Sequence, residues 1–421
     1  MKIFIVNLTF AIILIISNAY GFGSPTDFGE AEAPVGTTSS GPIAIANLNS
    51  NYNSSTYIPD QRLQDSIRAK LGKEKGEFIT YSDMQQLTEL DLSSCGIHDI
   101  TGLEYATNLR NLDLTNNQIT DITPLGNLIN LNEVNISYNQ IRDIRVIANL
   151  PNLTILRASY NLIKDITALA DSNLSNLTEL YLNGNMITDI TPLGVVTESS
   201  KPIFNNLIEL DISDNKFPRL PKIPSDHRNY CGVEEDAEKI KSLHPLQNLS
   251  NLTYLKASSN QISDILPLAN LTNLVELNLS DNLISNIKPL EKLFNLVDLN
   301  LCHNKIRDIT PIENLADLTD LNLNVNLINN ITPLKNLTNL VWLHLKYNFI
   351  TDIQPLVDNP GLYTEFPDSE TRNDMVDIRW NNLDLKVGSN NMLDIMKLIN
   401  RCVDIYYEPQ ECTETDCQKH P

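Results

Sequence analysis

Cys302 and His303 are adjacent in the chain and could in principle supply a nucleophile and its base. A thiol activated by an imidazole is an established route to covalent catalysis. Neighbouring residues of a strand face opposite sides, however, so this pair would be poorly placed for proton transfer. The six histidines are scattered, and no G-x-S-x-G, H-E-x-x-H, phosphate-loop or dinucleotide pattern occurs. The sequence therefore predicts no enzymatic activity, no cofactor and no metal site.

Asparagine recurs at a nearly constant spacing and offers another kind of chemistry, hydrogen bonding to the backbone. The frame is L-x-x-L-x-L-x-x-N-x-I-x-D-I-x-P-L, and most steps are 22 residues. A carboxamide carries both donors and acceptors, so an inward side chain can bond unpaired backbone groups of neighbouring turns. Cys95 opens this expected ladder, which continues through Asn117, Asn139, Asn161, Asn185, Asn215, Asn260, Asn282, Asn304, Asn326, Asn348 and Asn381.

A fixed period of this length indicates a solenoid. The alternating L-x-L core predicts a short strand, with Leu343 and Leu345 inward and Trp342, His344 and Lys346 outward. The I-x-D-I-x-P-L stretch predicts the return limb, where Asp caps the local backbone and Pro suits a tight connection. One coil cannot bury its own Leu and Ile side chains, so stacked coils must share a core.

These repeats resemble the 22-residue leucine-rich repeat class, which includes the bacterial internalins and a regulatory subunit of protein phosphatase 1. The resemblance covers about residues 57–409. It implies an α/β solenoid: a leucine-rich repeat horseshoe or right-handed superhelix, with a parallel β-sheet on the concave face, a helical N-terminal cap and a C-terminal cap. Internalins often continue into an immunoglobulin-like region and wall anchors. We expect neither here, so host-cell invasion is not carried over.

The chain divides into six expected segments: a signal peptide (1–21), a flexible linker (22–56), a helical N-terminal cap (57–86), an array of about twelve repeats (87–383), a C-terminal cap (384–409) and a tail (410–421). The signal is indicated by Lys2, an apolar run over residues 3–16 and a small-x-small site at residues 19–21. An uncleaved membrane anchor is the alternative. We expect a secreted, periplasmic or cell-surface protein.

The two caps have helical patterns. A first helix should start at Pro59-Asp60, bury Leu63, Ile67 and Leu71, and stop at Gly72. A capping box, Thr80 to Asp83, should open a second short helix. The C-terminal helix is expected at about residues 391–400, and its predicted inward side chains are Met392, Ile395, Met396 and Ile399.

The period breaks four times, with intervals of 24, 30, 45 and 33 residues. Aligned frames put the extra residues after the strand and its Asn, the largest insertion being near residues 221–244. Residues 234–243 predict a short helix within it. The 45-residue interval could instead hide a degenerate turn, and this alternative stays open.

The six cysteines lie in a chain predicted to be exported, where disulfides are permitted. We expect Cys95 to be a free buried thiol and Cys302 to face outward. A bridge among Cys402, Cys412 and Cys417 is an open possibility, and Cys231 lies in the insertion.

Outward strand positions hold the candidate binding residues. Trp342, His344, Tyr347 and Trp380 are expected to form one group on the last turns; Tyr138, Tyr160 and Tyr181 are expected to form a second, with Arg157 nearby. Exposed aromatic side chains are good anchors for a partner. The alternatives are that Tyr138 merely stacks on Tyr160, and that Trp380 covers the end of the array. A parallel acidic row is either a solvated face or a means of steering a basic partner; it comprises Glu89, Glu133, Glu179, Glu209, Glu276, Asp298 and Asp320.

The net charge of −21 argues against nucleic acid and anionic membranes as partners. We expect a secreted, monomeric scaffold that binds another protein on its concave face, with no membrane insertion of the mature chain. The alternatives are a surface adhesin for a glycan or host component, and a regulatory subunit of a phosphatase-like enzyme.

Overall fold

The computed structural model describes residues 54–171, 174–196, 202–215, 239–363 and 374–410, all within one compact unit, Asn49–Pro421. The expected signal peptide and most of the expected linker lie outside these ranges. Thr56, which we assigned to the linker, is buried, and its backbone N–H donates to the carbonyl of Ile79 at 2.8 Å. The folded part therefore begins before residue 57.

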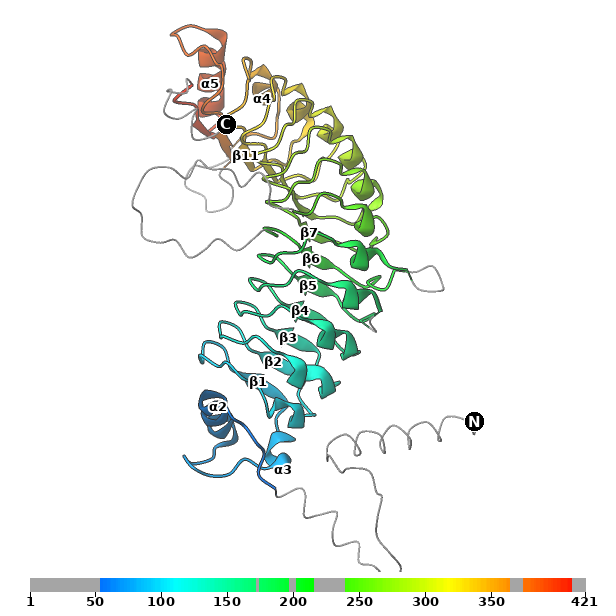
Figure 1. The fold of residues 1–421 in the computed structure, drawn as a ribbon. Helices are drawn as coiled ribbons and strands as arrows, with labels where there is room; N and C mark the ends of the chain where they lie inside the picture. The colour runs from blue at the N-terminus through cyan, green and yellow to red at the C-terminus, as the bar shows by residue number, and fades with distance from the viewer. Residues whose placement is uncertain (1–53, 172–173, 197–201, 216–238, 364–373, 411–421) are drawn as a thin grey trace, which may run out of the picture. The chain divides into compact units, whose positions relative to one another are not determined.

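In each repeat the first leucine position and the residue on either side of it form a three-residue strand. All strands of the described residues pair in parallel and in chain order, and Figure 1 shows them stacked along the array. A sheet in which every strand pairs only with its sequence neighbours is the arrangement of a solenoid, so the predicted leucine-rich repeat fold is confirmed. The strands are β1 (Glu89–Asp91), β2 (Asn111–Asp113), β3 (Glu133–Asn135), β4 (Ile155–Arg157), β5 (Glu179–Tyr181), β6 (Glu209–Asp211), β7 (Tyr254–Lys256), β8 (Glu276–Asn278), β9 (Asp298–Asn300), β10 (Asp320–Asn322), β11 (Trp342–His344), β12 (Met375–Asp377) and β13 (Asp404–Tyr406).

The return limbs run through short helices on the side opposite the sheet (Figure 1). Asp121 accepts from the N–H of Thr123 at 2.8 Å, and Asp308 accepts from that of Thr310 at 2.9 Å, so Asp caps these limbs as expected. The 3-10 helices are η2 (Leu103–Tyr105), η3 (Thr123–Asn127), η4 (Arg145–Asn149), η5 (Thr167–Asp171), η6 (Thr191–Gly194), η7 (His244–Leu246), η8 (Leu266–Asn270), η9 (Lys288–Leu290), η10 (Thr310–Ile312) and η11 (Thr332–Asn336), followed by the α-helix α4 (Gln354–Val357).

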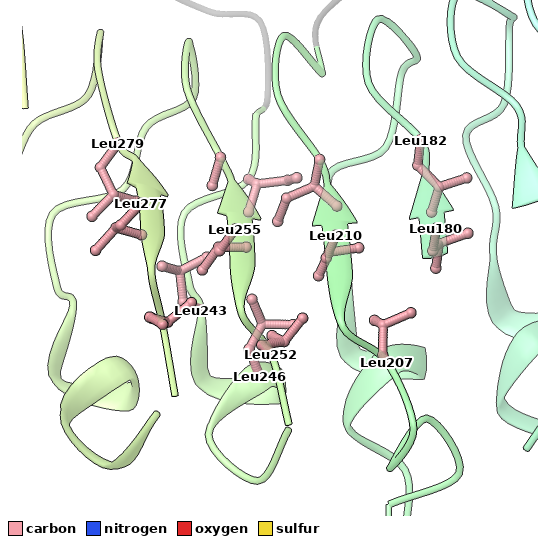
Figure 2. Packing of buried hydrophobic residues seen from close by; sticks show 14 of the residues in the cluster. Leu180, Leu182, Leu207, Leu210, Leu243, Leu246, Leu252, Leu255, Leu277 and Leu279 are labelled. Carbon is pink, nitrogen blue, oxygen red and sulfur yellow. The ribbon is translucent and has the colours of Figure 1, made fainter. Parts of the chain in front are cut away.

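Leucine and isoleucine side chains of successive turns form one continuous core between the sheet and the return limbs. Figure 2 shows Leu180, Leu210, Leu255 and Leu277 on adjoining strands, and all four are fully buried. Burying such a side chain contributes about 1.5–3 kcal/mol. Because most partners of each side chain belong to adjacent turns, stability depends on stacking.

The repeated asparagines point into this core and bond the backbone of two turns. The side-chain oxygen of Asn304 accepts from the N–H of Ile284 at 2.9 Å. Its amide nitrogen donates to the carbonyls of Leu279, at 3.0 Å, and Leu301, at 3.1 Å. The next asparagine, Asn326, also donates to the Leu301 carbonyl, at 2.9 Å. Such a carbonyl therefore has two amide donors, whereas the Ile284 N–H relies on a single side-chain acceptor.

Gln410 closes this hydrogen-bond pattern at the C-terminal end. Its side-chain oxygen accepts from the backbone N–H groups of Asn381, at 3.1 Å, and Leu383, at 3.4 Å. Its amide nitrogen donates to the carbonyl of Ile378 at 3.1 Å. Leu383 and Ile378 hold the backbone positions that a following ladder asparagine would reach. A glutamine from outside the repeat frame thus replaces the missing asparagine.

Cys95 occupies the first ladder position, but its thiol is only half-buried, which corrects the expectation of a buried one. It donates to the carbonyl of Ser93 at 3.4 Å. Among the described cysteines, Cys95, Cys302 and Cys402 are free thiols. The other members of the suggested bridge and the cysteine of the insertion lie outside the described residues.

Both expected N-terminal helices are confirmed. α2 (Gln61–Leu71) begins after Asp60, whose carboxylate accepts from the N–H groups of Arg62 and Leu63, and ends at Gly72. α3 (Tyr81–Met84) follows the expected capping box. The Asp60 carboxylate also accepts from the N–H of His98 at 2.9 Å, which ties the helical cap to the first return limb.

The C-terminal helix α5 (Asn390–Asn400) is present, but half of its predicted inward face was wrong. Ile395 is buried and Met392 partly buried, whereas Met396 and Ile399 are exposed. The inward face instead includes Asn391, Asp394 and Leu398, so the helix is rotated by about one residue. The Asn391 amide donates to the carbonyl of Thr351 at 2.9 Å and helps to fix this orientation.

The 45-residue interval does not hide another strand, because β6 pairs directly with β7 and Leu210 lies opposite Leu255. The degenerate-turn alternative is therefore wrong. Ile240 and Leu243 are buried and hold the two isoleucine positions of an ordinary return limb. Residues 239–243 are not helical, which contradicts the predicted helix for its described part; residues 234–238 lie outside the described ranges.

Candidate binding surface

Two rows of side chains project from the outward face of the sheet, as the repeat alignment predicted. Strand pairing puts Asp298, Asp320 and Trp342 in register, and likewise Asn300, Asn322 and His344. The first row contains the first residue of every strand: Glu89, Asn111, Glu133, Ile155, Glu179, Glu209, Tyr254, Glu276, Asp298, Asp320, Trp342, Met375 and Asp404. The second row contains the third residue: Asp91, Asp113, Asn135, Arg157, Tyr181, Asp211, Lys256, Asn278, Asn300, Asn322, His344, Asp377 and Tyr406.

Most Asp and Asn side chains of the second row serve the backbone. Asp113, for example, accepts from the N–H two residues later at 2.7 Å, and Asn278 does the same at 3.1 Å. Equivalent bonds are made by Asp91, Asn135, Asp211, Asn300, Asn322 and Asp377. These are Asx turns, in which the side chain substitutes for a backbone acceptor. Sequence reasoning missed this role and treated the positions only as surface.

Five second-row residues are neither Asp nor Asn and cannot form such a turn: Arg157, Tyr181, Lys256, His344 and Tyr406. Arg157 and Tyr181 lie side by side on β4 and β5, with the guanidinium 5.2 Å from the ring centroid. Both bond one carboxylate oxygen of Glu179, at 3.0 Å and 3.1 Å. Burial, followed by the hydrogen bond and charge of Glu209, raises the pKa of Tyr181. The centre of the face therefore holds a cation, an aromatic ring and carboxylates in contact.

A ridge of side chains borders the rows, formed by the residue before each ladder position. These residues have left-handed backbones, with φ between 52° and 69°. Tyr138 and Tyr160 of the ridge are stacked, with ring centroids 4.5 Å apart and planes 14° apart. The next ridge residue is Gly184, and a Cβ there would lie 2.6 Å from the Tyr160 ring. Tyr181 belongs to the second row, so the expected group of three tyrosines is instead a pair and a separate ring.

The C-terminal aromatic group also separates into two parts. Tyr347 and Trp380 are neighbours on the ridge and stack at 5.3 Å with planes 5° apart. The ammonium group of Lys346 lies 5.0 Å from the Tyr347 ring centroid. Trp342 begins β11 and belongs to the first row, five residues before the ridge residue Tyr347. Trp342 is 51% exposed. His344 is half-buried, and burial lowers its pKa although the nearby charges of Asp377 and Asp320 act in the opposite direction.

Carboxylates of the first row stand next to each other on β8, β9 and β10. Glu276, Asp298 and Asp320 are in register, and Lys256 reaches Glu276 at 3.6 Å. Burial, and then the charges of Asp320 and Glu276, raises the pKa of Asp298. The charge of this part of the face is therefore only partly compensated.

Cys302 and His303 do not form a catalytic pair. His303 bonds Asp281 of the preceding turn, with 2.6 Å between the ring nitrogen and a carboxylate oxygen. Burial raises the pKa of Cys302 to about 11, and the Asp281 charge adds to this shift, so the thiol is protonated at neutral pH. The nucleophile hypothesis requires a thiolate, and this environment disfavours one.

Within the described ranges, no group of three or more His, Cys, Asp or Glu side chains could hold a metal ion. Nor does any helix in the described part of the chain have the length and apolar character needed to cross a bilayer.

A family model described as "Leucine Rich repeats (2 copies)" matches residues 85–127, 107–149, 129–171, 151–195 and 239–292. The internalin InlF of Listeria monocytogenes is 30% identical to this chain and has a TM-score of 0.69; the match covers 84% of this chain and 92% of the internalin. A search of curated proteins finds no match.

Two more distant structures share the fold. A leucine-rich repeat protein of Leptospira interrogans is 21% identical, with a TM-score of 0.60, over 77% of this chain and 73% of that protein. The Arabidopsis receptor kinase HAESA, solved with the peptide hormone IDA and the co-receptor SERK1, is 21% identical, with a TM-score of 0.51. That match covers 65% of this chain and 44% of the receptor.

Proposed function

Since this chain belongs to the internalin-like leucine-rich repeat proteins, we propose that it is an exported, non-catalytic scaffold that holds another protein on the outward face of its sheet. Repeat solenoids commonly use such an extended surface for recognition. Export is supported by the apolar run and the small-x-small site in residues 1–21.

The observation that carries the proposal is the unbroken outward face. The thirteen strands of the described residues remain paired in chain order although the repeat period is interrupted four times. Every interruption falls after a strand and its ladder asparagine, so the two rows stay in register across the insertions. A long rigid array of side chains favours binding, because little conformational entropy is lost when a partner docks.

The proposed contact residues are the exposed or half-exposed side chains of this face and its ridge. They are Arg157 and Tyr181 at the centre, Tyr138 and Tyr160 on the ridge, and Trp342, His344, Tyr347 and Trp380 near the C-terminal end. Large aromatic rings and Arg dominate the binding energy of many protein interfaces. The aromatic stacks also stabilise the ridge, so single substitutions there need a stability control.

Capture of a partner by the immobilised full chain tests the proposal. The partner should come from extracellular and surface fractions of the source cells. Trp342→Ala combined with Tyr347→Ala should reduce the retained partner at least tenfold, because the exposed Trp342 ring and the partly exposed Tyr347 ring are both lost. The matched control is Leu266→Ala with Phe294→Ala, which removes two side chains that are 65% and 54% exposed on the return side.

Both double variants should keep the circular dichroism spectrum and nearly the thermal midpoint of the original chain. Losing the ring stack of Tyr347 accounts for about 0.5–1.5 kcal/mol at most. Equal capture by the original chain and the sheet-face variant would contradict the proposed site. Equal loss in both variants would indicate contact with more than the sheet face.

A further inference from the structure

Four neighbouring strands place three carboxylates beside an exposed indole ring. Glu276, Asp298, Asp320 and Trp342 are the first residues of β8, β9, β10 and β11, and each lies directly opposite the next. We call these four residues the acidic–aromatic strip. At a strand spacing of about 4.8 Å, it is about 14 Å long.

The negative charge of the strip is not fully compensated within the protein. Lys256 lies 3.6 Å from Glu276, and Asp320 accepts from the hydroxyl of Thr319 at 2.8 Å. Among the ion pairs of the described residues, none includes Asp298 or Asp320. Like charges directly opposite each other destabilise a sheet, and an added cation would relieve this repulsion.

Trp342 indicates which cation fits best. Its indole is half-exposed and lies in register with Asp320 on the preceding strand. A guanidinium group can bond a carboxylate through two N–H groups and also stack on an aromatic face. An ammonium group is a compact charge and lacks this planar double contact. The pairing of Asp320 with Trp342 therefore favours arginine over lysine.

We propose that the partner places an extended, arginine-rich segment along the acidic–aromatic strip, with one guanidinium between Asp298 and Asp320 and the next against Trp342. This inference rests on the proposed function and specifies the partner for part of the same face. An extended chain needs about five residues to cover 14 Å, and alternate side chains face the same way about 6.6 Å apart. The matching pattern is Arg-x-Arg-x-Arg.

A fluorescein-labelled Arg-Thr-Arg-Thr-Arg peptide tests this assignment by fluorescence anisotropy with the full chain. The same peptide with Lys, and the same peptide with Glu, are the comparison probes. The arginine peptide should bind at least threefold more tightly than the lysine peptide, and the glutamate peptide should not bind. Asp298→Asn combined with Asp320→Asn should weaken arginine-peptide binding at least tenfold, and Trp342→Ala should weaken it at least threefold.

The control for overall charge is Glu313→Gln combined with Asp317→Asn. These two carboxylates lie between β9 and β10 and outside the first row, so the control removes the same charge without changing a residue of the strip. It should change binding less than twofold. Circular dichroism checks folding, and loss of repulsion in the strip should leave the thermal midpoint unchanged or higher.

Equal weakening by the two charge-removing double variants would overturn the proposal and leave the strip as a solvated acidic face. Equal binding of the arginine and lysine peptides would overturn the assignment to arginine. Capture of the natural partner by two double variants distinguishes a failure of this inference from a failure of the proposed function. If Trp342→Ala with Tyr347→Ala abolishes capture but Asp298→Asn with Asp320→Asn does not, binding on the sheet face stands and the arginine-rich segment falls.

Discussion

Replacing one ladder asparagine should cost less than its hydrogen bonds suggest. Asn304→Ala removes the acceptor of the Ile284 N–H and one donor from each of three carbonyls. The Cys302 carbonyl keeps its bond from the N–H of Asp281 at 2.9 Å. The Leu279 carbonyl keeps its bond from Asn282 at 3.1 Å, and the carbonyl of Leu301 keeps a donor from the next turn at 2.9 Å. Only the buried N–H is left without a partner, so the free energy of unfolding should fall by about 1–3 kcal/mol.

Removing two adjacent ladder asparagines should cost more than the sum of the single changes. Asn304→Ala with Asn326→Ala takes both amide donors from the Leu301 carbonyl. This second unpaired group adds a coupling of about 1–3 kcal/mol. Asn304→Ala with Asn348→Ala is the matched control, because Asn348 bonds the carbonyls of Leu323 and Leu345 and shares neither with Asn304. That pair should be additive within about 0.5 kcal/mol.

Urea unfolding of the full chain measures both cycles, with circular dichroism and tryptophan fluorescence recorded together. Long repeat arrays can unfold in segments, so the two signals must coincide before a single free energy is assigned. Additive behaviour of the adjacent pair would refute the shared-carbonyl argument. Coupling of equal size in the distant pair would refute it as well, because no hydrogen-bond acceptor is shared there.

Three further outcomes are expected. Gln410→Ala should destabilise the C-terminal cap by about 1–3 kcal/mol and speed hydrogen exchange of the Leu383 amide, which loses its acceptor. Burial holds the pKa of His344 below 6.5, so the folded state binds fewer protons than the unfolded state just below that pH. The free energy of unfolding should therefore fall as pH drops through this range, and His344→Gln should reduce this pH dependence when it is measured by urea unfolding. Cys302, whose pKa burial raises to about 11, should react with iodoacetamide at pH 8 more slowly than the exposed Cys402, as mass spectrometry of the labelled peptides would show.

The repeat period was sufficient to predict the strands and the register of the outward face. Leu343 and Leu345 are predicted to point inward, and the same prediction applies to every turn because neighbouring strands pair in register. A carboxamide has the same set of donors and acceptors wherever it occurs, so its inward role also follows from its type. A wrong register would have put leucine in water at every turn, which excludes it.

The Asx turns of the second row were missed although the sequence carries a signal for them. Asp91, Asp113 and Asn135 are each followed two residues later by Ser or Thr, a spacing typical of such turns. On an outward strand position, the same side chains also look like ordinary solvent-exposed polar residues. Only the short side-chain-to-backbone distances distinguish the two readings.

The C-terminal cap was less predictable because it lies outside the repeat. Gln410 is 29 residues from Asn381, so no period points to it. The rotation of α5 depends on contacts with α4 and the preceding turn, including the bond from Asn391 to the Thr351 carbonyl. Its apolar residues occur on more than one side, and helix periodicity alone could not decide which side is buried.

Five second-row residues are neither Asp nor Asn, so their side chains cannot form the Asx turn. A turn without the Asx side chain loses a bond worth about 0.5–1.5 kcal/mol unless another group replaces it. The hydroxyl of Ser213 accepts from the N–H of Ser258 at 3.1 Å, and the Asn324 side chain accepts from that of Lys346 at 2.7 Å. These acceptors come from the preceding turns. The fold thus supplies the turns after Lys256 and His344 with other acceptors, so neither turn needs an Asp or Asn side chain.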